Sequence, residues 1–450
     1  MTTIGLDAPD VARTDANALV PTIWPRGAAR REDGVVTVGG VALTEIAETY
    51  GTPAYVFDEA EFRARCADFR TAFADFDIYY AGKSFLCRAV ARIVAETGLS
   101  LDVCTEGELR LALSAGFPAQ RIVLHGNNKS ATELSLAVEH GVGRIVLDSF
   151  DEVARLTELA REQGVRPAVL VRATVGVRPD THDNIATAHE DQKFGFSVAA
   201  GAARRAVEEI AAADVLDLRG LHIHLGSQIL GTREFEVGAE RAVVLLKELS
   251  AVLGGELPEL SLGGGFGIAY LPEHQALPAE ALAARLRGTV ERACAAEGLR
   301  VPRLAIEPGR AISGPSGCTI YRVGTIKHLP GLRTYVAVDG GMSDNIRPPL
   351  YDGVYTAVIA DRDSAAPGMR VRVVGRHCDA GDVIVRDDDL PEDLRVGDLV
   401  AVPATGAYCR SLSNNFNHVP RPPVVAVADG VARLIIRGET FDDLFGLDVG

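Results

Sequence analysis

Short hydrophobic runs alternate with helical stretches along the first two-thirds of the chain. The runs are rich in Val, Ile and Leu and lie at residues 54–57, 78–80, 99–103, 121–124, 144–147, 168–172, 220–224, 260–262 and 304–306. Amphipathic stretches typical of helices separate many of them, for example at residues 106–114, 131–139, 150–163 and 233–252. Strands that alternate with helices in this way indicate βα units and a parallel sheet.

The number of repeats favours a closed barrel over an open sheet. Without the entering run at residues 54–57, about eight repeats fill roughly 240 residues, as in a (β/α)8 barrel of the TIM type. An open doubly wound sheet remains the alternative, because it is built from the same βα units. We therefore expect a barrel domain over residues 54–312.

The pattern changes after residue 312. Strand-like runs follow one another with few long helical stretches between them, at residues 336–339, 370–374, 383–385, 399–402 and 424–427. They predict a second, all-β domain, a sandwich or small barrel, over residues 313–450. We expect the strand-like segment at residues 34–43 and a short helix after it, within residues 31–53, to complete this domain. Residues 1–30 lack clear periodicity and predict an N-terminal extension.

Composition limits the classes of partner. A chain of 450 residues suits two domains, and its net charge of −15 argues against nucleic acid and anionic membranes as partners. No apolar run approaches the roughly 18 residues needed to span a bilayer. The N-terminus does not resemble a signal peptide, so we expect a cytoplasmic protein. The seven cysteines form no CxxC pair, so the sequence indicates neither a zinc site nor a disulfide framework.

One lysine stands out at the end of the first barrel strand. The chain has five lysines among its 46 basic residues, and Lys83 lies three residues after the run at residues 78–80. An amine in a desolvated place loses its charge easily and can form a Schiff base, which a guanidinium cannot. The alternative is a lysine that only extends its amine to solvent from a strand end.

Three later strands also end in residues suited to chemistry. His222 and His224 point the same way at the sixth, a GGGFG turn (263–267) follows the seventh, and Glu307 and Arg310 follow the eighth. Each has an ordinary explanation: core histidines, a tight turn and an ion pair. In a barrel, however, these ends share one face, and the loops after strands seven and eight commonly bind phosphate. Together with Lys83 they indicate a pyridoxal 5'-phosphate site.

The chain resembles the fold type III pyridoxal-phosphate-dependent decarboxylases, and most closely their diaminopimelate branch. The similarity runs from about residue 45 to the second domain. It is carried by the segments YYAGKSFLC (79–87), LDVCTEGEL (101–109), LHGNNKS (124–130), HEDQKFGFS (189–197), HIHLGSQI (222–229), GGGFGI (263–268), EPGRAI (307–312), VDGGMSDNIRPPLY (338–351), GRHCDAGDVIVRD (375–387) and GAYCRSLSNNFN (406–417).

The resemblance implies a role for each matching residue. It implies a homodimer whose active site lies at the subunit interface and whose substrate is a small amino acid. Lys83 would hold the cofactor covalently, and Cys378 of the partner subunit would be the general acid. His224 would stack on the cofactor ring, and Glu307 would contact the ring nitrogen. The cofactor's phosphate would be bound by Ser227, Gly264, Gly265, Gly309 and Arg310. The substrate would be bound by Arg310, Arg347, Tyr351 and Asp379, and Tyr408 would contact both cofactor and substrate.

One departure from the family keeps other functions open. The diaminopimelate branch usually has Glu after the cysteine, whereas this chain has Asp379, whose side chain is shorter by one methylene. The leading interpretation is decarboxylation of meso-diaminopimelate to L-lysine in lysine biosynthesis. A decarboxylase of D-lysine or D-ornithine is the alternative. A racemase is disfavoured because no matching tyrosine motif is found, and an inactive regulatory homologue because Lys83, Glu307 and Cys378 are all present.

Overall fold

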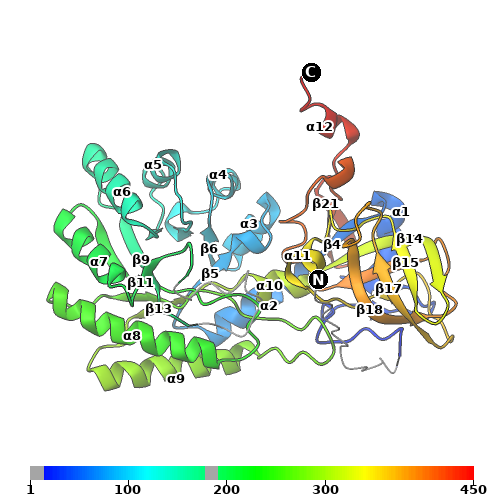
Figure 1. Cartoon of the computed structure of the whole chain (residues 1–450), viewed down its shortest axis with the longest axis horizontal. Coiled ribbons are helices and arrows are strands. Elements are labelled where there is room, and N and C mark those ends of the chain that lie inside the picture. The colour runs from blue at the N-terminus through cyan, green and yellow to red at the C-terminus, as the bar shows by residue number, and fades with distance from the viewer. Residues whose placement is uncertain (1–14, 178–190) are drawn as a thin grey trace.

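A barrel and a β domain lie side by side in the computed structural model, which describes residues 15–177 and 191–450 (Figure 1). The first part of the predicted extension, residues 1–14, lies outside the described residues, as does the start of the HEDQKFGFS segment. Among the residues that are described, no helix is long and apolar enough to cross a membrane.

The predicted (β/α)8 barrel is confirmed. Eight parallel strands close into a ring, because the last pairs with the first. They are β5 (Asp77–Ala81), β6 (Ser100–Val103), β7 (Ile122–Leu124), β8 (Arg144–Leu147), β9 (Ala168–Thr174), β11 (Asp217–His222), β12 (Glu259–Ser261) and β13 (Arg303–Ile306), with the two-residue β10 (Phe196–Ser197) beside β9. The closed ring brings the carboxyl ends of all eight strands to one face.

Helices surround this ring (Figure 1). They are α2 (Glu59–Ala72), α3 (Arg88–Glu96), α4 (Glu106–Ser114), α5 (Ala131–Glu139), α6 (Phe150–Gln163), α7 (Ala202–Ala213), α8 (Arg233–Leu253) and α9 (Ala279–Glu297). Local sequence fixes several of their starts. Ser130 and Glu133 form a reciprocal capping box at α5, and the Thr105 side chain accepts from the Glu108 N–H at α4.

The β domain is built around one long strand, β14 (Gly317–Leu329), that the sequence pattern missed. β14 pairs with β15 (Arg333–Val338) and β19 (Leu399–Pro403), among others. The other strands of the domain are β16 (Val358–Ile359), β17 (Gly368–Val374), β18 (Val383–Pro391), β20 (Val424–Ala428) and β21 (Val431–Ile436). Short helices α10 (Arg310–Ser313), α11 (Arg347–Tyr351) and α12 (Phe441–Phe445) lie at its margins and in its loops. Only the first half of β14 is continuously buried, so it lacks a regular alternation.

Two expectations about the N-terminal segments need correction. The run at residues 54–57 forms β4 (Ala54–Asp58), which pairs with β14 and β20 and therefore belongs to the β domain rather than to the barrel. The segment at residues 34–43 does not complete that sheet. It forms β2 (Val36–Val38) and β3 (Val41–Ala42), which make a separate small sheet with β1 (Ala29–Arg30), followed by α1 (Leu43–Tyr50). A hydrogen bond from Val36 N–H to Ala360 O attaches it to the β domain.

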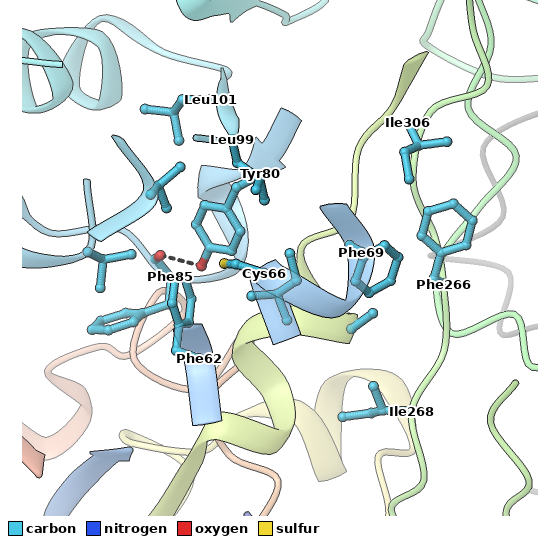
Figure 2. Close-up of a cluster of buried hydrophobic side chains, with 14 of the residues drawn as sticks. Phe62, Cys66, Phe69, Tyr80, Phe85, Leu99, Leu101, Phe266, Ile268 and Ile306 are labelled. Atoms are coloured by element: carbon cyan, nitrogen blue, oxygen red, sulfur yellow. Dashed lines mark hydrogen bonds between the residues drawn. The ribbon is translucent and has the colours of Figure 1, made fainter. Parts of the chain in front are cut away.

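A cluster of buried hydrophobic side chains, many of them labelled in Figure 2, includes contacts between the two domains. Phe57 on β4 contacts Phe62 on α2 and Phe85 just after β5, with ring centroids 5.3 and 5.7 Å apart. Phe62 in turn packs edge-on against Tyr80, at 5.2 Å. Because Phe85 lies two residues from Lys83, the segment that carries the lysine is part of this shared core.

We expect close strand packing at Gly220 to make any larger side chain there destabilising. A Cβ added to this β11 residue would lie 1.8 Å from the backbone oxygen of Glu259 on β12. Overpacking costs about 1–3 kcal/mol, so Gly220→Ala should lower the thermal midpoint by roughly 5 °C in calorimetry. Gly255→Ala is the matched control, because nothing lies within 4 Å of its added Cβ. Equal midpoints for the two variants would contradict the prediction.

Candidate active site

Lys83 lies in a tightly held turn at the carboxyl end of β5. The residues Gly82–Ser84 form one 3-10 turn, and the Tyr80 hydroxyl closes it by donating to Phe85 O at 2.7 Å (Figure 2). The buried Ser84 hydroxyl donates to Ala81 O at 2.8 Å and accepts from the Ser313 hydroxyl at 3.0 Å. The turn is therefore fixed from the barrel side and from the segment after β13.

The surroundings of Lys83 act on its charge in opposite directions. Burial alone lowers the pKa of its ammonium group, but the nearby Cys104, Tyr408 and Asp102 raise that pKa above the ordinary lysine value. The sequence argument expected a desolvated amine that loses its charge easily, and the net shift has the opposite sign. The reason is that burial here comes with groups that carry negative charge when ionised.

Glu307 supplies a buried carboxylate at the end of β13. It is only 4% exposed, and its oxygens accept from Ser261 Oγ at 2.9 Å and lie 3.1 Å from His222 Nε2. His125 Nε2 is 3.3 Å away, off the hydrogen-bonding angle. Burial raises the pKa of the Glu307 carboxyl, but His222 and His125 lower this pKa by more, so that the net value is well below the usual one. Glu307 therefore stays ionised.

A second acid lies behind this group. Asp102 Oδ1 is 3.7 Å from His125 Nε2, and burial, with a contribution from Glu307, raises the pKa of Asp102 to about 6. His125, His222 and Glu307 also have the spacing of a metal-binding trio, with ligand atoms within 4.8 Å. The Glu307 oxygens already contact Ser261 and His222 and, with about four acceptor sites, can still accept from a further hydrogen-bond donor.

His224 presents a neutral ring to the site. Its Nδ1 accepts from the Gly264 N–H at 3.1 Å, which leaves that nitrogen unprotonated. Burial lowers the pKa of His224 well below its usual value, and the positive charges of Lys83 and Arg172 add smaller contributions in the same direction. The His222 and His224 rings are nearly parallel, at 7°, with centroids 6.5 Å apart. A neutral, flat ring of this kind can stack on an aromatic ligand.

Glycines shape a close backbone approach beside His224. A Cβ on Gly265, whose φ is +108°, would lie 2.3 Å from Gly226 O, and one on Gly264 would lie 2.1 Å from Glu307 O. Gly309 is similarly tight against Ala81, at 2.9 Å. Only glycine lets these segments come together. The N–H groups of Gly263 and Gly264 donate to Ser261 Oγ and His224 Nδ1, so the Gly265 N–H is the one left for an anion among the described residues. We call residues 263–265 the glycine cradle.

Two buried arginines lie beyond the cradle. Arg310 donates to Ser227 Oγ at 2.8 Å and to the Tyr270 hydroxyl at 2.6 Å, and its Cζ lies 4.7 Å from the Tyr408 ring centroid. Arg347, on α11, is equally buried. Neither arginine forms an ion pair with a carboxylate of the described residues. Arg310 Nε is also buried with no hydrogen-bond partner among them.

The remaining predicted residues divide between the site and the surface. Tyr351 ends α11, one turn after Arg347. Cys378 and Asp379 instead lie in an exposed turn between β17 and β18. The Cys378 N–H contacts Asn417 Oδ1 at 3.4 Å, and no hydrogen bond or ion pair of the described residues joins this turn to Lys83. Within one chain, the predicted general acid is therefore not part of the barrel site.

Sequence reasoning missed several residues that shape the site. Asp102 and His125 lie on and just after the second and third barrel strands, so the rule that identified Lys83 could have found them too. Ser261 ends β12 and could have been found in the same way. Tyr270 has no such signal, because it lies five residues beyond the glycine cradle in a loop without a pattern.

Comparisons with known proteins agree with this geometry. Residues 59–314 match the family model described as pyridoxal-dependent decarboxylase, pyridoxal binding domain. The diaminopimelate decarboxylase of Mycobacterium tuberculosis is 52% identical over 440 residues, covering 96% of this chain and 98% of the relative. That of Bacillus subtilis is 44% identical over 424 residues, covering 93% and 96%.

Solved structures show the same similarity. Diaminopimelate decarboxylase from M. jannaschii in complex with L-lysine has a TM-score of 0.89 at 29% identity, covering 95% of this chain and 98% of that one. The expected family and fold are thus confirmed, and the protein is a carboxy-lyase. The chain belongs to the pyridoxal-dependent decarboxylases and, within them, to the diaminopimelate decarboxylase family.

Proposed function

We propose that this enzyme decarboxylates meso-diaminopimelate to L-lysine, with pyridoxal 5'-phosphate as cofactor and a homodimer as the working unit. The observation that carries the proposal is the pair of buried arginines, Arg310 and Arg347, which no carboxylate of the described residues neutralises. A buried cation without a neutralising carboxylate is costly, and an anionic ligand lowers that cost. Diaminopimelate has a second carboxylate that remains after decarboxylation, whereas a monocarboxylic diamino acid has none.

The residues of the site suit pyridoxal phosphate. Bound there, it supplies an electron sink for the electron pair left when the bond to CO2 breaks. Lys83 would hold it covalently, the ionised Glu307 would accept from a protonated ring nitrogen, and the neutral His224 would stack on its ring. In the glycine cradle the Gly265 N–H makes no hydrogen bond to the described residues and could bind the phosphate. Ser227, Gly264, Gly265 and Gly309 would hold the phosphate, and Arg310 would act on it through its bond to Ser227.

The substrate would be held at both ends. Arg310, Arg347 and Tyr351 would bind the distal carboxylate, and Tyr408 would contact substrate and cofactor. Asp379 of the partner subunit would bind the distal amino group. Since Asp is about 1.5 Å shorter than the Glu usual in the family, this turn would have to lie closer to the substrate. Cys378 of the partner subunit would return a proton to the carbon that lost CO2.

A symmetric dimer would bring Cys378 and Asp379 to a barrel site. In a two-fold dimer each subunit gives the same surface to the other, so the exposed turn with Cys378 and Asp379 can enter the partner's barrel mouth. The exposed position of Cys378 in one chain supports this arrangement. A cytoplasmic location belongs to the same proposal. It is supported by the seven cysteines, all of which are free, as in a reducing compartment.

Substrate preference tests the proposal directly. We expect the enzyme loaded with pyridoxal phosphate to release CO2 from meso-diaminopimelate at least about 100-fold faster than from D-lysine or D-ornithine. Lys83→Ala should abolish release, whereas Lys327→Ala, which alters an exposed lysine on β14, should leave it unchanged. The readouts are CO2 and the amino-acid product. Faster turnover of D-lysine or D-ornithine would favour the alternative that Asp379 suggests.

Subunit complementation tests the shared site. Chains with Lys83→Ala and chains with Cys378→Ala should each be inactive alone. Coexpressed in equal amounts, they should recover about a quarter of wild-type activity, because half of the dimers are mixed and each mixed dimer has one intact site. Mixing two batches of Lys83→Ala protein is the control. No recovery in mixed dimers verified by mass spectrometry would refute the exchange of Cys378 between subunits.

A further inference from the structure

Tyr270 connects the two unpaired arginines. It lies in the loop after β12, and its side chain is 2% exposed. Its hydroxyl accepts from Arg310 Nη1 at 2.6 Å, and its ring centroid is 4.6 Å from the Cζ of Arg347. One buried side chain thus contacts both guanidinium groups, one by a hydrogen bond and the other through the face of its ring.

A second tyrosine completes the support of Arg347. Tyr355 packs edge-on against Tyr270, with centroids 5.3 Å apart, and its hydroxyl accepts from Arg347 Nη1. The Cζ of Arg347 is 5.4 Å from the Tyr355 ring centroid. Arg347 is therefore held by two aromatic rings, and Tyr270 is the only one of the two that also contacts Arg310.

This support stabilises positive charge without neutralising it. Elsewhere in the barrel, Arg144 and Arg219 both pair with the carboxylate of Glu259. Arg310 and Arg347 are each only 5% exposed, and the described residues provide phenol oxygens and ring faces in place of a carboxylate. Ring faces attract a cation by about 0.5–2 kcal/mol, which is less than the several kcal/mol that it costs to bury a charge. The pair remains able to bind an anion.

We propose that Tyr270 is a positioning residue that holds Arg310 and Arg347 together as a clamp for one carboxylate, and so sets the preference for dicarboxylic over monocarboxylic substrates. The inference rests on the proposed function, because it takes the distal carboxylate of the substrate as the ligand of the clamp. Tyr270 itself does not need to touch the reacting atoms.

Kinetics of two variants test this role. With cofactor at saturation, Tyr270→Leu should raise the KM for meso-diaminopimelate about tenfold and change kcat less than about threefold, because the lost contacts act on binding. Its kinetic constants for D-lysine should stay within about twofold. Tyr270→Phe keeps the ring and should raise the KM for diaminopimelate about threefold. Tyr50→Phe is the matched control, since it removes a partly buried tyrosine hydroxyl that bonds to Ala432 O on β21 and to neither arginine.

Binding without turnover gives an independent readout. Pimelate, a dicarboxylate without amino groups, should raise the thermal midpoint of the wild-type holoenzyme more than that of Tyr270→Leu. Two results for Tyr270→Leu would overturn the role of Tyr270. One is a KM that rises by the same factor for diaminopimelate and for D-lysine. The other is a KM for diaminopimelate and a stabilisation by pimelate that both equal those of the wild type. A wild-type enzyme that does not prefer diaminopimelate would instead overturn the proposed function, and with it the inference. The two failures are thus distinguishable.

Discussion

A buried, ionised carboxylate at the barrel mouth is the constraint on which the rest of the site depends. Glu307 can keep its charge away from water only because other groups compensate for the lost solvation. These groups come from separate strands: His222 ends β11, Ser261 ends β12 and His125 follows β7. Barrel closure brings them to one point, so the fold itself lets Glu307 stay ionised, as its proposed role at the cofactor ring requires.

The core between the domains holds the turn of the lysine, which follows the strand next to that of this carboxylate. The turn of Lys83 is bonded to Tyr80 and Ser313 and is followed by Phe85, which packs against a strand of the β domain. The β domain also supplies Arg347 and Tyr408. The barrel thus holds the groups assigned to the cofactor, and the β domain provides much of the substrate side. A substitution at the domain boundary would therefore affect both the cofactor groups and the substrate groups.

The sequence predicted the barrel well because every βα repeat has a strong local pattern. It placed Lys83, His224 and Glu307 correctly at strand ends, and the carboxyl ends of all barrel strands lie at the barrel mouth. It failed where pairing between distant segments decides the structure: β4 is a short apolar run like the barrel strands, yet it pairs with β14 and β20. Tyr270 was missed because its role depends on contacts with Arg310 and Arg347, which no local pattern encodes.

The charge state of the cofactor ring tests the central claim most directly. We would load the wild-type and Glu307→Gln proteins with pyridoxal phosphate labelled with 15N at the ring nitrogen and record its NMR shift over a pH series. The account predicts a ring nitrogen that stays protonated into the alkaline range in the wild type and is unprotonated at neutral pH in Glu307→Gln. The same protonation state in both proteins would contradict it.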